Sequence, residues 1–304
     1  MVDFVPAVDL LYDAVKAKGH VCIGLDTCAG YVPERERRKA QNDAQAVLAF
    51  NKAVIDATYD AAACYKVQIA YYEEMGLAGL GTYSETLKYI RSKGSLVIAD
   101  IKRGDIADTA LRYANAHFSG DFEADFVTLS PYMGMDSIEP WLSKAVSCGK
   151  GAFVLVRTSN PGRKDFQLLK TSPQSAYLYE AVGEKLSELA KQNKGKCGYG
   201  IFGAVTGCAE RDEALRIRQQ YPELFFLIPG YGAQGGGAKD AVSLLRNGNG
   251  GVVNASRSII TAWQNAQNYT EQAIKDADNN FASGASRAAV LKMRDEILSY
   301  GAQQ

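Results

Sequence analysis

The 304-residue sequence predicts a closed (β/α)₈ barrel. Short apolar runs that suit strands alternate along the whole chain with amphipathic stretches of helical spacing. There are eight of each, and no sustained change in composition divides the chain. We therefore expect residues 1–304 to form a single α/β barrel domain with extra helical decorations. A doubly wound open sheet is the second candidate.

The expected strands are brief apolar segments. In chain order they are Val21–Asp26, Ala63–Ile69, Leu96–Asp100, Phe126–Ser130, Phe153–Thr158, Gly200–Thr206, Phe225–Pro229 and Gly251–Ala255. The clearest helices have apolar residues three and four apart. They are Ala44–Thr58, Ser84–Lys93, Ala107–Phe118, Ser137–Ser147, Gln174–Gln192, Glu210–Gln219, Lys239–Arg246 and Arg287–Leu298. Residues 31–42, 161–173 and 264–286 are expected to be longer connections or added helices.

The turn after the first strand separates the two candidate folds. A dinucleotide-binding open sheet has Gly-x-Gly-x-x-Gly at this place. This chain has Gly-Leu-Asp-Thr-Cys at residues 24–28 instead. The difference favours the barrel.

Composition excludes several classes of partner. Lys plus Arg and Asp plus Glu each number 34, so no overall field attracts the chain to nucleic acid or to an anionic membrane. The apolar runs are too short to span a membrane, and acidic residues interrupt the first twenty positions, unlike a signal peptide. We expect a cytoplasmic protein. The six cysteines form no Cys-x-x-Cys pair, and those at 22 and 64 are expected to be core thiols.

The segment 99–106, Ala-Asp-Ile-Lys-Arg-Gly-Asp-Ile, places charges at the end of an apolar strand. Residues two apart on a strand share a face, so Asp100 and Lys102 should point into the same space. Asp105 should lie on the following loop or at the helix start, where its carboxylate can cap backbone amides. Taken alone, a satisfied ion pair with an N-cap explains this trio as well as a catalytic site does.

Other strand ends add polar residues to the same rim. Because the carboxyl ends of barrel strands surround one pocket, these residues are best considered together. They are Asp26 after the first strand, Lys66 and Gln68 in the second, and Arg-Thr-Ser-Asn at 157–160 after the fifth. Each has an ordinary structural explanation as a turn or surface residue. Their coincidence on one rim favours an active site.

The last two strand ends indicate phosphate binding. Residues 229–237 form a glycine-rich loop after the seventh strand, and Arg257 follows the eighth. Backbone amides of such a loop approach an anion closely, and an arginine makes a charge-assisted contact with phosphate. We expect a phosphorylated small molecule, over which the loop can close. Metal chemistry is less favoured because neither histidine falls at a strand end; carboxylate-bound Mg²⁺ stays open, although Lys66 and Lys102 would repel a cation. A Schiff base on Lys102 also stays open.

Taken together, these residues resemble the orotidine 5′-phosphate decarboxylase family, in its longer bacterial-type branch. The family hallmark Asp-x-Lys-x-x-Asp is matched by Asp100, Lys102 and Asp105. The likeness covers nearly the whole chain. The other matched positions are the strand-one aspartate Asp26, the strand-two lysine Lys66, the pyrimidine-facing Ser159, and the phosphate-binding Gln234 and Arg257.

The resemblance implies decarboxylation of orotidine 5′-monophosphate to UMP, the last step of de novo pyrimidine synthesis, with no metal and no cofactor. In it a C6 carbanion is stabilised and protonated by Lys102. The implied catalytic residues are Lys102, Asp100, Asp105 and Lys66, expected to form an alternating charged network. The implied substrate-binding residues are Asp26, Thr109, Ser159, Gln234, Gly235 and Arg257. A homodimer is implied, in which Asp105 and Thr109 reach the neighbouring pocket.

Two alternatives remain. A Mg²⁺-dependent sugar-phosphate lyase or decarboxylase on the same barrel shares Asp-x-Lys-x-x-Asp, but it has a metal-binding carboxylate near the end of strand two. This chain offers Lys66 there. A catalytically silent nucleotide-binding barrel would be expected to lack Lys102 or one of the aspartates, and this chain has them all.

Overall fold

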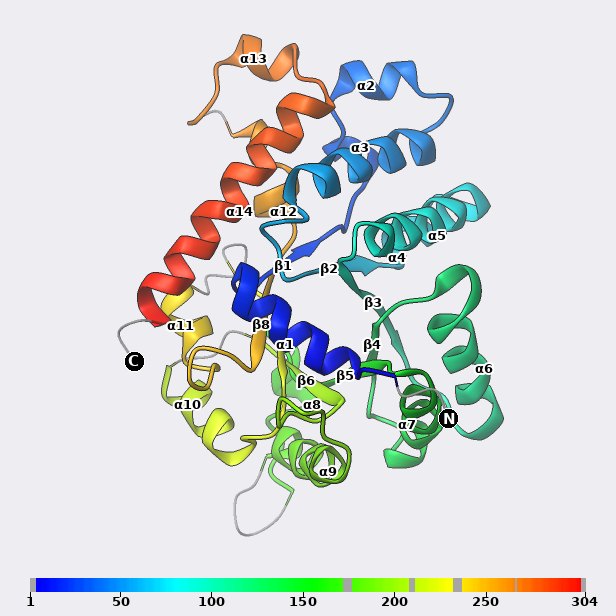
Figure 1. Cartoon of the computed structure of the whole chain (residues 1–304), viewed down its shortest axis with the longest axis vertical. Coiled ribbons are helices and arrows are strands. Elements are labelled where there is room, and N and C mark those ends of the chain that lie inside the picture. The colour runs from blue at the N-terminus through cyan, green and yellow to red at the C-terminus, as the bar shows by residue number, and fades with distance from the viewer. Residues whose placement is uncertain (1–3, 172–176, 208–210, 232–236, 266, 302–304) are drawn as a thin grey trace.

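Eight parallel strands close into a barrel in chain order (Figure 1). The computed structural model describes residues 4–171, 177–207, 211–231, 237–265 and 267–301. The strands are β1 (Val21–Gly24), β2 (Cys64–Gln68), β3 (Leu96–Arg103), β4 (Phe126–Leu129), β5 (Gly151–Arg157), β6 (Phe202–Thr206), β7 (Phe226–Ile228) and β8 (Gly251–Ala255). Pairing of β1 with β8 closes the sheet. The predicted barrel is confirmed, and the open sheet is excluded.

Helices surround the barrel. The α-helices are α1 (Ala7–Lys18), α2 (Glu34–Lys39), α3 (Asp43–Thr58), α4 (Ala70–Glu73), α5 (Gly76–Ser92), α6 (Ala107–Phe118), α7 (Glu139–Cys148), α8 (Arg163–Phe166), α9 (Leu178–Gln192), α10 (Arg211–Gln220), α11 (Ala238–Val242), α12 (Arg257–Ile260), α13 (Glu271–Lys275) and α14 (Asn279–Gly301). Short 3₁₀ turns are η1 (Ala29–Tyr31), η2 (Gly120–Phe122), η3 (Met135–Ser137) and η4 (Ala262–Gln264). Each expected helix has a counterpart, and the three long connections hold added helices as predicted.

Two helices begin earlier than the sequence predicts, because small residues occupy their first turns. The prediction that α5 begins at Ser84 is wrong, because the helix begins at Gly76. A Cβ on Gly79 would lie 2.0 Å from the carbonyl oxygen of Tyr72, so this glycine allows α5 to pack closely on α4. Likewise α14 begins before Arg287, at Asn279. Its first buried residues are alanines and serines, which are too small or too polar to stand out as an apolar face in the sequence. Such residues produce a weak apolar pattern.

Helix α1 was not expected from the sequence, and it crosses the barrel in Figure 1. Its contacts are with loops that lead into strands. Ala7 donates its N–H to Gly149 (2.8 Å), and Asp9 accepts the N–H groups of Lys196 and Cys197 (3.0 and 2.8 Å). Since these loops precede β5 and β6, α1 covers the amino ends of the strands. The carboxyl ends stay open at the other end of the barrel.

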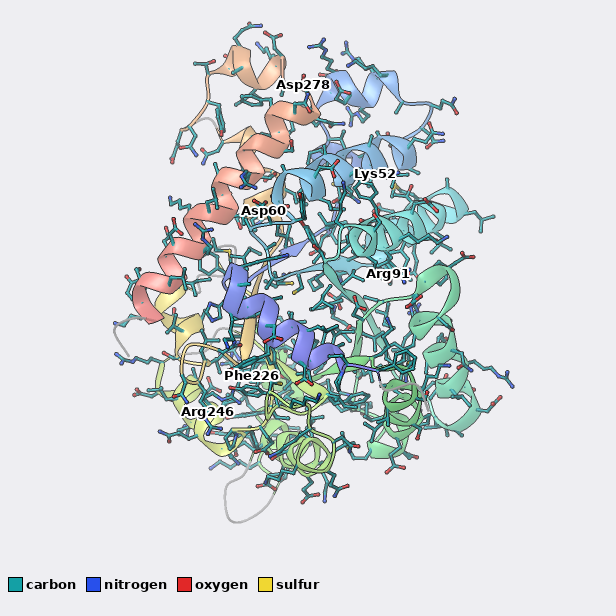
Figure 2. The ribbon with its side chains drawn as sticks, viewed as in Figure 1. Lys52, Asp60, Arg91, Phe226, Arg246 and Asp278 are labelled. Atoms are coloured by element: carbon teal, nitrogen blue, oxygen red, sulfur yellow. The ribbon has the colours of Figure 1, made fainter. Side chains whose placement is uncertain are left out.

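The long helix α14 lies along the barrel beside α3 and α12 (Figure 1). Its Arg287 donates to both carboxylate oxygens of Asp60 (2.6 and 2.9 Å), which is labelled in Figure 2. Ser286 donates to the carbonyl of Ile259 in α12 (3.0 Å). These contacts fix α14 to the segments on either side of it.

The thiols at 22 and 64 are buried, as predicted. Cys22 and Cys64 are register partners on β1 and β2, and Cys22 lies 3.6 Å from the side-chain oxygen of Asn254. Since Asn254 lines the pocket described below, these thiols belong to the barrel core beneath it. In the described part of the chain, no helix is long and apolar enough to cross a membrane.

Candidate active site

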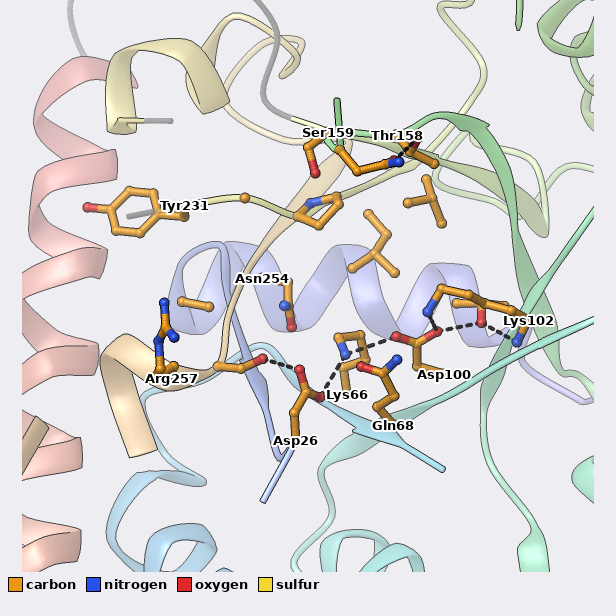
Figure 3. A pocket seen from close by; sticks show the side chains of 18 of the residues that line it. Asp26, Lys66, Gln68, Asp100, Lys102, Thr158, Ser159, Tyr231, Asn254 and Arg257 are labelled. Atoms are coloured by element: carbon orange, nitrogen blue, oxygen red, sulfur yellow. Dashed lines mark hydrogen bonds and ion pairs between the residues drawn. The ribbon is translucent and has the colours of Figure 1, made fainter. Parts of the chain in front are cut away.

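A cavity of about 460 Å³ opens at the carboxyl end of the barrel (Figure 3). All eight strands, or the residues just after them, contribute to its lining. Parallel strands converge at this end, which is where barrels of this type hold ligands. The volume is in the range of sites for small molecules.

Four charged side chains form a continuous chain along one side of the cavity (Figure 3). The Lys66 ammonium lies 3.0 Å from Asp26 Oδ1 and 3.0 Å from Asp100 Oδ2. The Lys102 ammonium lies 2.6 Å from Asp100 Oδ1. The order is therefore Asp26, Lys66, Asp100, Lys102, with alternating charge and no net charge. Three different strand ends bring these groups together.

The interior of this network is shielded from water. The side chains of Lys66 and Asp100 are 6% and 8% exposed. Burial alone would raise the pKa of the Asp100 carboxyl, but the ammonium groups of Lys66 and Lys102 outweigh it, so the pKa lies well below its usual value. Burial alone would lower the pKa of Lys66, but the carboxylates of Asp100 and Asp26 raise it above the usual value. Both groups are charged at neutral pH.

Lys102 differs from Lys66 because it faces the open cavity. Its side chain is 45% exposed and reaches back over Asp100 (Figure 3). The prediction that the strand ends at Asp100 is wrong, since β3 continues to Arg103. The pairing of β3 with β4 shifts register between Ala99 and Arg103, and Lys102 has a φ of 46°, which side chains rarely adopt. This bulge directs the Lys102 side chain toward the cavity.

Thr128 on β4 holds the bulge, and it was not among the site residues expected from the sequence. Its hydroxyl accepts the backbone N–H groups of Ile101 and Lys102, both at 3.0 Å, and donates to Asp100 Oδ1 at 2.8 Å. One donor and two acceptors exhaust the capacity of a hydroxyl. A polar residue in an otherwise apolar strand was the available signal. Ser256, which donates to Asp26 Oδ2 at 2.8 Å, completes the other end of the network.

The opposite end of the cavity carries Arg257 and Tyr231 (Figure 3). Arg257 is exposed, and within the described ranges its guanidinium has no ion pair or hydrogen bond. A cationic group of this kind can take an anion from solution. Ser159 lines the cavity across from the charged network. Gln234 and Gly235 lie outside the described residues.

Comparison with known proteins indicates which chemistry this site performs. A family model described as "Orotidine 5'-phosphate decarboxylase / HUMPS family" matches residues 19–272. The chain belongs to this family. The orotidine 5′-phosphate decarboxylase of Clostridium tetani is 51% identical over 291 residues, which are 96% of this chain and 97% of that relative.

Solved structures agree with this membership of the decarboxylase/HUMPS family. The OMP decarboxylase of Leishmania donovani matches with a TM-score of 0.75 and 31% identity, covering 98% of this chain and 99% of that one. The UMP synthase of the same organism matches with a TM-score of 0.73 and 33% identity. It covers 96% of this chain and 57% of the longer UMP synthase chain. The resemblance seen in the motifs is therefore confirmed over nearly the full length.

Two predicted site residues of this family member do not line its own cavity. Asp105 accepts the N–H of Ile106, the residue just before α6, at 2.9 Å, and it caps no amide of the helix, so the expected capping contact is wrong. Thr109 is exposed one turn into α6. Within one chain, Asp26 rather than Asp105 is therefore the second carboxylate of the charged network.

Arg157 shares the fifth strand end with cavity residues but points elsewhere. It donates to both carboxylate oxygens of Glu213 on α10 (3.2 and 2.6 Å), whereas Thr158, Ser159 and Asn160 line the cavity. Grouping Arg157 with the rim was thus wrong. The strand irregularity between Leu155 and Arg157 turns the arginine outward.

Neither histidine belongs to the site. Nε2 of His20 lies 3.0 Å from the carbonyl of Gly248 at the closed end of the barrel. His117 is buried on α6 and stacks on Phe122 and Trp141. Among the residues that the structure describes, no three His, Cys, Asp or Glu side chains gather in a way that could hold a metal ion.

Proposed function

We propose that this chain decarboxylates orotidine 5′-monophosphate to UMP and CO₂, with no metal and no cofactor in the chemistry. The observation that carries the proposal is the position of Lys102. Its ammonium is the one member of the charged network that is widely open to the cavity, and Asp100 holds it at 2.6 Å. Family membership and the close curated relative support the same reaction.

The cavity suggests how the substrate lies. Its phosphate binds at the Arg257 end, where the guanidinium is available to an anion. Resemblance to the family, rather than the cavity, adds Gln234 and Gly235 to the substrate-binding residues. The pyrimidine lies at the other end, between Lys102 and Ser159. Asp26 and Lys66 lie between the two ends, where the ribose hydroxyls find a carboxylate and an ammonium to hydrogen-bond.

The reaction needs only a positive charge and a proton at C6. The bond between C6 and its carboxylate breaks, CO₂ leaves, and the electron pair stays on C6 as a carbanion. The nearby Lys102 ammonium stabilises this charge without reorganisation, because Asp100 already holds it in place. Lys102 then donates a proton to C6, which gives UMP, and regains one from water.

Phosphate binding supports the chemistry from a distance. Contacts at Arg257 do not touch C6, yet their energy can close the site and align substrate with the charged network. Lys66 has an indirect role as well. By neutralising Asp26 and Asp100 it keeps the buried part of the network charged and ordered.

A Mg²⁺-dependent sugar-phosphate enzyme is the rival on this barrel. Such an enzyme needs oxygen ligands converging on a free cation site. Here the Lys66 ammonium lies within 3.0 Å of both Asp26 and Asp100, and so occupies the space between these carboxylates. A silent nucleotide-binding barrel is disfavoured because Lys102 and its partners are all present.

We further propose a homodimer in which Asp105 and Thr109 complete the neighbour's site. Both lie beyond the cavity of their own chain, in a region that carries several exposed apolar side chains. Those on α6 and its start are Ile106, Leu111 and Tyr113, and those after β4 are Tyr132 and Met133. A patch of this kind is typical of a protein interface. The hydroxyl and carboxylate beside it would then enter the partner's pocket.

The decarboxylase proposal is tested by mixing the protein with orotidine 5′-monophosphate in excess EDTA and following pyrimidine absorbance. We expect rapid conversion to UMP, and almost none with Lys102→Ala, which should still bind UMP. Retained turnover in Lys102→Ala would refute the assigned role. Absence of wild-type turnover, with activity appearing on addition of Mg²⁺ and a sugar phosphate, would favour the metal-dependent rival.

The shared site is tested by mixing inactive Asp105→Ala and Lys102→Ala proteins after partial unfolding and refolding. A heterodimer should contain one pocket with both native residues, so about a quarter of the sites regain activity at equal mixing. Heterodimers that form, as shown by mass spectrometry, but stay inactive would count against the exchange of Asp105.

A further inference from the structure

Tyr231 borders two cavities. It lines the active-site cavity on the side of Arg257, and its side chain extends toward α14 (Figure 3). It also lines a second cavity of about 330 Å³, between α12 and α14, whose helical wall includes the small residues Ala285, Ala288 and Ala289. Gly230, with a φ of 101°, turns the chain immediately before the tyrosine. Tyr231 therefore has a second cavity beside it, on the side of α14, in addition to the active-site cavity.

A hydrogen bond to α14 holds the ring between these spaces. The Tyr231 hydroxyl donates to the carboxylate of Glu296, 65 residues along the chain. Both side chains are partly buried, and a hydrogen bond to an ionised acceptor is stronger than one between neutral groups. The helix itself packs its buried face along α3 and α12, and Arg287 also binds Asp60. The contact thus joins a packed helix to a loop residue of the active site.

We propose that Glu296 is a positioning residue that fixes Tyr231 as the wall of the phosphate end of the active site. This inference rests on the proposed function, which places the substrate phosphate beside Arg257. Without Glu296 the ring loses the contact that ties it to α14, and it can shift toward the second cavity. Substrate binding must then order the ring again, and that cost reduces affinity without altering the charged network at Lys102.

The expected effect of Glu296→Ala is a rise in KM for orotidine 5′-monophosphate of about 2- to 10-fold, the affinity lost on ordering one side chain. The kcat at saturation should stay unchanged. Tyr231→Phe removes the same hydrogen bond and should give the same result. The double variant should be no worse than either single one, because the two residues act through one contact.

Two variants serve as controls. Glu296→Gln retains an acceptor and should restore most of the affinity. Asp295→Ala removes the neighbouring exposed carboxylate of α14, which contacts Arg294, and should leave KM unchanged. Calorimetric titration adds a second measurement, because general damage to the fold would weaken the binding of all ligands alike. Glu296→Ala should weaken the binding of UMP and leave the binding of uridine, which lacks the phosphate, as in the wild type.

The outcomes separate this inference from the proposed function. If the wild type converts substrate and Glu296→Ala has an unchanged KM and UMP affinity, the role of Glu296 is refuted while the proposed function stands. Additive losses in the double variant, or equal weakening of UMP and uridine, also refute it. A wild type that converts no substrate refutes the proposed function, and the UMP and uridine titrations then still decide whether Glu296 acts on phosphate binding.

Discussion

Replacing Lys66 with methionine removes the cation between two carboxylates and nearly keeps the side-chain volume. Since the ammonium lies 3.0 Å from both Asp26 and Asp100, the two carboxylate oxygens are at most twice that distance apart. At such a separation, two negative charges repel each other by about 3 kcal/mol for an effective dielectric constant of about 20. The folded variant is therefore either destabilised by this repulsion, or one of the two carboxylates binds a proton.

The expected loss of stability follows from the burial of the three groups. The side chains of Lys66, Asp26 and Asp100 are 6%, 17% and 8% exposed. Removing one partner from buried charge pairs costs about 3–5 kcal/mol. A chain of 304 residues has an unfolding entropy of about 0.6 kcal/mol per kelvin, so Tm should fall by about 5–8 °C.

Scanning calorimetry of wild type and Lys66→Met at about pH 7.5 and about pH 5 measures this effect. In the wild type, the lowered pKa of Asp100 gives stability that is present above its unfolded-state value of 3.8 and lost as the pH falls below it. In the variant, repulsion raises the carboxylate pKa, so the Tm difference should narrow at the lower pH. The double variant Lys66→Met with Asp26→Asn should recover part of the loss. A fall in Tm of less than about 1 °C, equal at both pH values, would refute the coupled network.

Three further predictions concern other parts of the molecule. Arg257→Ala should lower kcat/KM by about 10- to 100-fold in steady-state assays, the effect of losing a charge-assisted contact, and unchanged efficiency would remove the phosphate assignment. Thr128→Val should lower kcat by about tenfold or more because Lys102 is misplaced, while Thr128→Ser restores it; full activity in Thr128→Val would show that the bulge forms without the hydroxyl. Burial lowers the pKa of His117 from 6.5 to about 4. As the pH falls from 6.5 toward 4 the unfolded chain binds a proton that the folded protein does not, so the protein loses stability. Between pH 7 and 5, wild type should lose about 2 kcal/mol more in urea unfolding than His117→Phe, and parallel losses would contradict this.

Much of the barrel and its active rim was predictable from local pattern. The eight apolar runs become the eight strands because a strand buried on both faces must be apolar, and its neighbours in sequence supply the helices. Asp100 and Lys102 were expected to share a space because side chains two apart on a strand share a face. Family motifs at the strand ends then pointed to the chemistry. These inferences need only the order and type of residues.

Local pattern failed where backbone geometry departs from the regular strand. The bulge at Lys102 needs a positive φ at a non-glycine residue, and it forms because Thr128, on the next strand, accepts two amides. The irregularity in β5 turns Arg157 away from the rim toward Glu213. A polar residue within the apolar fourth strand marks Thr128, but nothing in segments 99–103 or 155–157 themselves signals either departure.

By itself the sequence determined the barrel, the charged rim and the family, because periodicity, composition and motif spacing are local properties of the chain. Only the tertiary structure decided the order Asp26, Lys66, Asp100, Lys102 in the network and the contact of Tyr231 with α14. These contacts join residues from separate strands and helices, and their distances are set by closure of the barrel and packing of α14 against it. Charge coupling falls off with distance through space, and distance along the chain does not determine it.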